Sequence, residues 1–165
     1  MNARLVMVLL TIGSCALAAP ALAQHAATGP CASGVTATTA SYRMAGSIGA
    51  QEEMYLPSEV KARHIKDGEI MLGGQMSMVE KTPGTKAFHL EVHICNRDGT
   101  VAKGLRPAIV LGASTKVPAA IMVGIGEPMT DYHYGNDVAL KPGARVTVKV
   151  TVKGQTAVLH LTAPR

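Results

Sequence analysis

Apolar and polar residues alternate along several short stretches of the chain, and this period of two predicts β-strands. The clearest stretch covers residues 88–95, where Leu, Val and Ile at alternate positions share one face. His89, Glu91 and His93 share the other face. Residues 144–152 alternate as regularly, with valine at every second position. Both stretches therefore predict strands that bury one face against a core.

Five further stretches are predicted as short strands from their place between glycine- and proline-rich turn signals. They are residues 42–48, 68–79, 105–111, 119–125 and 156–162. About seven short strands at this spacing predict an all-β fold, an antiparallel β-sandwich of immunoglobulin or cupredoxin type. Residues 126–136 are rich in turn-forming residues and predict a loop.

The N-terminal segment predicts export. A basic residue, a short apolar run and the small residues around Ala23 indicate a cleaved signal peptide at 1–23. A lipoprotein signal ending at Cys15 is the alternative. Residues 24–37 then predict a flexible tail, and 38–165 predict one sandwich domain. We therefore expect a periplasmic protein.

Cys31 and Cys95 remain after the signal peptide. An even pair of cysteines in an oxidising compartment favours a disulfide. Two buried free thiols and a thiolate metal site are the alternatives.

The composition and the motifs of the chain argue against several classes of function. The chain carries a formal charge of +5 without a cluster of basic residues, and 3% of its residues are aromatic. This argues against nucleic-acid binding. No apolar stretch after the signal peptide reaches the length of a membrane span. The chain has no nucleophile elbow, His-Glu-x-x-His, phosphate-binding glycine loop or Cys-x-x-Cys motif, so we do not expect an enzyme.

Metal-ligand chemistry is the stronger signal. Alternation places His89, Glu91 and His93 on one strand face, and two imidazoles with a carboxylate suit a divalent transition metal. A solvated polar sheet face explains the same triplet equally well. His133 is predicted in a loop, either as a ligand or as a hydrogen-bonded packing residue. Met122 is predicted on the face of its strand that points away from the core.

Met76 and Met78 share a predicted strand face, so exposure of one or both is expected. Exposed thioethers are suited to binding soft metals. Packing in the core is the alternative for the other methionines of the domain.

Two segments resemble a known family. His89-Leu90-Glu91, followed by a methionine and then by His133-Tyr134-Gly135, is similar to the periplasmic ferrous-iron transport proteins that partner an inner-membrane iron permease. The resemblance implies a dimeric, immunoglobulin-like, cupredoxin-related domain. It also implies a copper or ferrous-iron site made by His89, Glu91, Met122 and His133. Met129 lies in an insertion between the last two and is the alternative thioether ligand.

The function expected from the sequence is therefore binding of copper, ferrous iron or both, in metal uptake or handling. A metal-free sandwich that binds another protein through its sheet face is the alternative from a different class.

Overall fold

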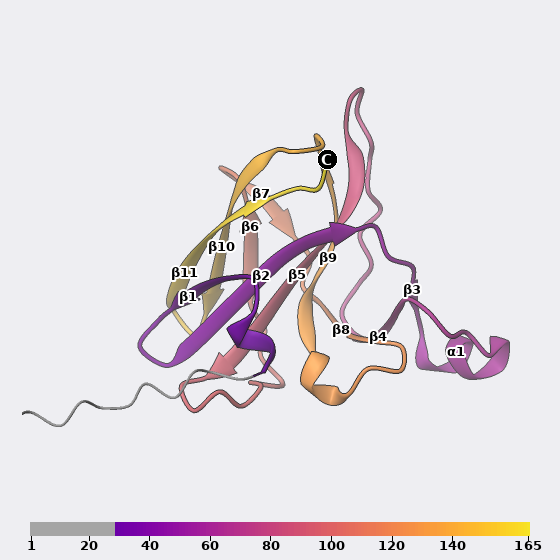
Figure 1. Ribbon diagram of the computed structural model, residues 1–165, viewed down its shortest axis with the longest axis horizontal. Helices are drawn as coiled ribbons and strands as arrows, with labels where there is room; N and C mark the ends of the chain where they lie inside the picture. Colours follow the sequence, from indigo (N-terminus) through magenta and orange to yellow (C-terminus); the bar gives the residue numbers. More distant parts are fainter. Residues whose placement is uncertain (1–28) are drawn as a thin grey trace, which may run out of the picture.

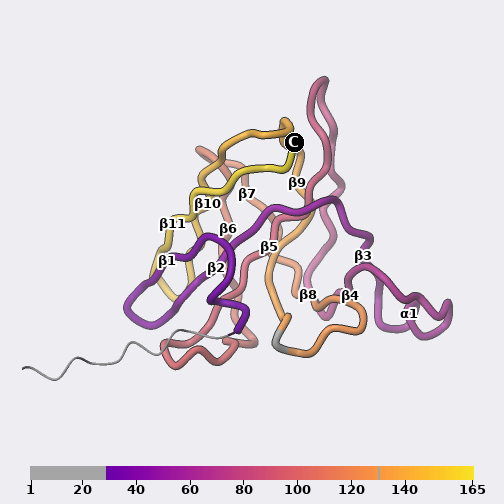
Figure 2. The backbone as a smooth tube through the Cα atoms, viewed as in Figure 1, coloured from indigo at the N-terminus to yellow at the C-terminus, as the bar shows by residue number. Residues whose placement is uncertain are grey.

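The computed structural model describes residues 29–165 (Figures 1 and 2), so the predicted signal peptide at 1–23 lies outside the described residues. Within 29–165 the chain forms two packed β-sheets, which confirms the prediction of an all-β sandwich. The described part contains eleven strands, more than the seven predicted, because several of them are only two to four residues long. None of its helices is long and apolar enough to cross a membrane.

The larger sheet has seven strands, and the smaller has four. In spatial order the larger sheet holds β1 (Val35–Thr38), β2 (Tyr42–Ala50), β5 (Lys86–Asn96), β9 (His133–Leu140), β8 (Ala120–Gly124), β4 (Glu69–Gly73) and β3 (Met54–Tyr55). The smaller sheet holds β11 (Gln155–Thr162), β10 (Arg145–Val152), β6 (Ala108–Leu111) and β7 (Thr115–Val117). The short helices are η1 (Pro30–Ala32), α1 (Pro57–Arg63) and η2 (Met129–Asp131).

Neighbouring strands pair antiparallel except β3 and β4, which are parallel. In Figure 1, β10 and β11 lie beside β1 and β2, whereas α1 lies beyond the opposite edge of the larger sheet. Three residues, 51–53, connect β2, which is next to the β1 edge of the larger sheet, to β3 at its opposite edge.

The core lies between the two sheets. Leu90, Val92 and Ile94 of β5 are completely buried there, and so are Val148 and Leu159 of the smaller sheet. The alternation in the sequence therefore identified the inner face of β5 correctly.

The N-terminal part of the described chain is tied to the sheet. Cys31 in η1 forms a disulfide with Cys95 in β5, as predicted. β1 pairs with β2 from Val35 onward, within the 24–37 segment that was predicted as a flexible tail. The sandwich therefore includes residues before 38.

His133 does not lie in a loop. The structure corrects this prediction, because His133 begins β9, a central strand between β5 and β8. The turn-like sequence that follows has a packing explanation at Gly135. A β-carbon there would lie 1.8 Å from the Leu90 carbonyl oxygen, so only glycine lets β9 approach β5 this closely.

Candidate metal centre

The outer face of the seven-stranded sheet, which points away from the core, carries the candidate site. Directly opposite residues of antiparallel strands project from the same face. On this face His89 of β5 lies opposite Asp137 of β9, and Met122 of β8 lies opposite His133 of β9. Glu69 at the start of β4 lies opposite Gly124 of β8. Four strands, β4, β5, β8 and β9, thus bring potential ligands to one face of the sheet.

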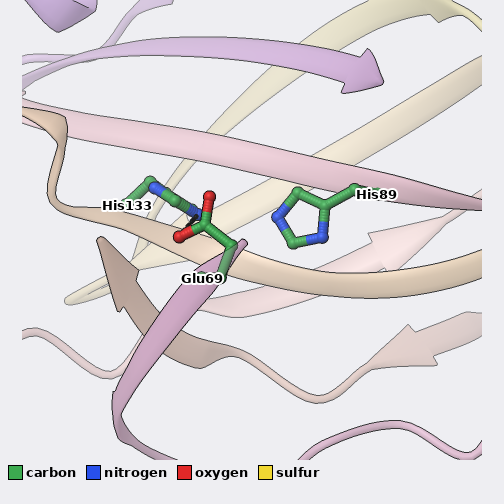
Figure 3. A group of neighbouring side chains, drawn as sticks. All are labelled: Glu69, His89 and His133. Atoms are coloured by element: carbon green, nitrogen blue, oxygen red, sulfur yellow. Dashed lines mark ion pairs between the residues drawn. The ribbon is translucent and has the colours of Figure 1, made fainter. Parts of the chain in front are cut away.

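These side chains are buried although they lie on the outer face. Glu69 is 5% exposed, His89 3% and His133 1%. Figure 3 shows the Glu69 carboxylate lying between the two imidazole rings. One donor atom from each residue lies within 4.8 Å of the other two. Two buried imidazoles and one buried carboxylate therefore converge on a common point.

The converging atoms have no hydrogen-bond partners. Across residues 29–165, the buried side-chain atoms without a partner are Glu69 Oε2, His89 Nε2 and His133 Nε2. His133 Nε2 and Glu69 Oε2 are 3.8 Å apart, which is too long for a hydrogen bond. Leaving a buried polar atom unsatisfied costs about 1–3 kcal/mol. Three such atoms at one point indicate a place built for a ligand.

The other ring nitrogen of each histidine is held in place. His133 Nδ1 lies 2.8 Å from the Asp131 carbonyl oxygen, which only accepts, so Nδ1 carries the proton and donates it. His89 Nδ1 lies 3.2 Å from Asp137 Oδ1 and donates to that carboxylate. In both rings the Nε2 lone pair is then free and points toward Glu69. Metal-binding histidines are oriented by such hydrogen bonds on their other nitrogen.

Burial and charge also act on the protonation of these groups. Burial raises the pKa of the Glu69 carboxyl to about 8, and the negative charges of Glu52 and Asp131 add to this effect. Burial lowers the pKa of His133, although the hydrogen bond to Asp131 and the charge of Glu91 oppose it. At neutral pH the metal-free site therefore holds a protonated carboxyl and a neutral His133.

A second pair on the same face is internally satisfied. His93 Nε2 lies 2.5 Å from Glu91 Oε1, and Ser47 donates to Glu91 Oε2 at 2.9 Å. His93 Nδ1 lies 3.2 Å from the Tyr132 carbonyl oxygen, so both nitrogens of His93 donate. A ring that donates from both nitrogens is an imidazolium.

The pKa shifts of this pair agree with an ion pair. Burial would raise the pKa of Glu91, but the hydrogen bond and charge of His93 outweigh it and lower that pKa to about 2. Burial would lower the pKa of His93, but its interactions with Glu91 raise it instead.

Of the four ligands that the sequence suggested, His89 and His133 form one candidate group with Glu69. Glu91 belongs to a second candidate group, with His133 and Asp131. His89, His133 and the completely buried Met122 share the outer face. Glu91 lies on that face too, but both of its oxygens are engaged by His93 and Ser47. It does approach His133, at 3.8 Å, but on the Nδ1 side that already donates to Asp131. Met129, in η2, is 47% exposed.

Sequence reasoning missed Glu69 and Asp137. Glu69 stands at the start of a strand whose partner, β8, is about fifty residues away in the chain, so no local pattern links it to His133. Asp137 has a signal in retrospect, because it follows His133 and Gly135 with the period of a strand. The expectation of a loop at 126–136 concealed that period.

Comparison of the chain with protein-family models, curated proteins and solved structures gave no match in any of the three.

Proposed function

We propose that this protein binds a divalent transition-metal ion at Glu69, His89 and His133, and that it serves in the uptake or handling of copper or ferrous iron. The observation that carries the proposal is the convergence of three unpartnered buried atoms, Glu69 Oε2, His89 Nε2 and His133 Nε2. A cation at that point would satisfy all three atoms together.

The donor set favours a particular class of ion. Two imidazoles with one carboxylate, leaving other coordination positions free, are the ligands of non-haem ferrous iron and also accept Cu(II). Hard ions such as Mg²⁺ and Ca²⁺ prefer oxygen ligands throughout. The hydrogen bonds from His89 to Asp137 and from His133 to the Asp131 carbonyl support the imidazoles as ligands.

Two methionines favour copper as one of the ions handled. Met122 projects beside His133, and Met71 of β4 lies opposite Met122 on the same face. A thioether is a soft donor that prefers Cu(I). We propose Met122 as a thioether ligand that joins the two imidazoles when copper is reduced.

The charged residues of a surface groove near Glu69 favour the approach of a cation. Glu52, whose charge raises the pKa of Glu69, lines a surface groove of about 580 Å³ together with Glu53 and Asp67. Lys66 lines the same groove, so three carboxylates against one ammonium group leave it with a net negative charge on a chain whose overall charge is +5. Cations are attracted to this side of the molecule.

The proposed location is the periplasm. The Cys31–Cys95 disulfide supports an oxidising compartment. Binding without catalytic turnover is part of the proposal. A role beside an inner-membrane iron permease, and a homodimer, rest on the sequence resemblance alone.

A pair of isosteric variants tests the site. Purified protein is titrated with Cu(II), and with Fe(II) under anaerobic conditions, by isothermal titration calorimetry. The wild-type protein is expected to bind one equivalent. Glu69→Gln removes the anionic oxygen of the unpartnered group, so its affinity should fall at least about tenfold. The matched control is Glu91→Gln, which should stay within about threefold of the wild type.

The opposite ranking of the two variants would assign the carboxylate ligand to Glu91, as the sequence resemblance implied. Absence of binding in the wild-type protein would refute the function and favour the metal-free interaction sandwich.

A further inference from the structure

Two neighbouring methionines stand out on the surface. Met78 is 96% exposed and Met76 is 51% exposed, the highest values among the large apolar side chains of residues 29–165. Burying a methionine side chain stabilises a protein by about 1.5–3 kcal/mol, so leaving two of them in water forgoes that gain. Both lie in the connection between β4 and β5, which protrudes at the top of Figures 1 and 2.

The backbone around Met76 is fixed to the sheet. The Ser77 amide donates to Asn136 Oδ1 at 2.7 Å, and Asn136 Nδ2 donates to the Gln75 carbonyl at 2.7 Å. Asn136 is completely buried in β9 and also donates to the Pro118 carbonyl. These bonds hold both peptide groups that flank Met76, so its position is defined.

The spacing of the two methionines suits one shared ion. From Met76 to Glu80 exposed and half-buried residues alternate, as they do along an extended backbone, although no strand is formed there. In such a backbone, residues i and i+2 project to the same side about 7 Å apart. Methionine is unbranched and has three rotatable bonds, so two side chains at this spacing can bring their sulfurs to one point. Thioether sulfur is a soft, neutral donor that selects Cu(I) over harder divalent ions.

We propose that Met76 and Met78 form a second, surface site that binds Cu(I) through their two thioether sulfurs. This site is separate from the buried Glu69–His89–His133 centre and does not depend on it. Asn136, which anchors the methionine segment, directly precedes Asp137, which orients His89. The surface site is therefore hydrogen-bonded to β9, the same strand that carries Asp137 and His133 of the buried centre.

The test uses full-length, disulfide-bonded protein labelled with ¹³C at the methionine methyl groups. Ag(I), which is a redox-inert analogue of Cu(I), is titrated while the methyl resonances are followed by NMR. Met76→Leu and Met78→Leu assign the two signals. Both signals should shift together and saturate at one equivalent of Ag(I). In each single variant the remaining methionine should need at least about ten times more Ag(I).

Two controls separate this site from other binding. Leu56→Met places one isolated methionine at a position that is 45% exposed, and its methyl signal should respond only at high Ag(I). In His89→Ala the Met76 and Met78 shifts should persist, because the buried centre is not involved. The proposal is overturned if Met78 responds equally in the wild type and in Met76→Leu, or no more strongly than the methyl introduced by Leu56→Met.

Discussion

Two pairs of histidine and carboxylate side chains lie on the same sheet face and behave in opposite ways. Glu91 and His93 form a close ion pair, and both nitrogens of His93 donate. At the other pair, Glu69 and His89, one imidazole nitrogen and one carboxylate oxygen are buried without partners. His133 lies between the two groups, with its ring 5.7 Å from that of His89 and 5.6 Å from that of His93.

The difference shows how placement decides what the same chemical groups can do. Histidine and carboxylate neutralise each other when they can touch. Glu69 and the two imidazoles lie on separate strands, β4, β5 and β9, and the Nδ1 atoms of the rings are already occupied. Their remaining lone pairs can be satisfied by a cation. The satisfied pair stabilises the fold, and the unsatisfied one is available for function.

The largest effect is expected from removing one imidazole on each side of this comparison. His89→Ala should lower the affinity for Cu(II) or Fe(II) by about 100-fold or more, because it deletes a ligand. His93→Ala, four residues along the same strand face, should change it by less than about threefold. Calorimetric titration of both variants measures this difference. Equal losses would mean that the two groups act as one site.

The second prediction concerns the stability of the metal-free protein. The pKa of Glu69 is about 8 in the folded protein and about 4.5 ordinarily, so between these values the folded state holds a proton that the unfolded chain has lost. The unfolding free energy should therefore fall as pH rises from about 5 to about 8, by about 3–4 kcal/mol. Urea denaturation in the presence of a chelator, repeated across this range, measures the slope.

Glu69→Gln provides the control for that slope. Glutamine does not titrate, so the variant should lose most of the decline between pH 5 and pH 8 while keeping the same fold. A wild-type protein whose stability rises across this range would contradict the burial of Glu69 as an uncharged group.

The third prediction concerns Asp137, whose carboxylate orients the proposed ligand His89. Asp137→Ala removes the acceptor for His89 Nδ1 and should weaken metal binding by about 10- to 100-fold. Gln51→Ala removes the other hydrogen bond to Asp137, made at 3.0 Å to Oδ2, and should have a smaller effect. The same calorimetric titration ranks the two. If Gln51→Ala proves the more damaging, Asp137 acts through local packing and not by orienting His89.

The fourth prediction concerns the soft donor. Met122→Leu keeps the volume of a completely buried side chain but removes its sulfur. Cu(I) affinity, measured by competition with a chromogenic Cu(I) chelator, should fall about tenfold, and Cu(II) affinity should stay nearly constant. Met129→Leu is the matched variant for the alternative thioether. A larger loss there would move the ligand to η2.

Comparison of the structure with the sequence predictions shows which features of the fold and the site could be predicted from one sequence. The strands of the core were predictable because alternation is local, and β5 shows it most clearly. The sequence predicts a loop at His133 because Gly135 and Asn136 are usual in turns, whereas tight packing of β9 against Leu90 requires the glycine. Glu69 could not be identified, since its approach to His133 depends on the pairing of β4 with β8 and of β8 with β9. Local patterns do not encode such pairing.

The smallest effect is expected at the satisfied pair, and its pH dependence defines its role. The pKa of Glu91 is lowered to about 2, so its stabilising effect is present above about pH 4.5 and is lost as pH falls toward 2. The pKa of His93 is raised above 6.5, so its effect is present below that value and is lost as pH rises through the folded pKa. The pair therefore stabilises the fold most between about pH 4.5 and 6.5.

His93→Gln should lower the unfolding free energy by about 1 kcal/mol at pH 5.5 and by much less at pH 9. The effect at pH 5.5 is no larger because the partly exposed Glu91 is screened by solvent. Ser47→Ala removes a hydrogen bond from an uncharged donor to a carboxylate that is ionised at both pH values, so its cost should be the same at each. Urea denaturation of the two variants measures this contrast, and an equal cost of His93→Gln at pH 5.5 and pH 9 would show that His93 contributes by packing and not by charge.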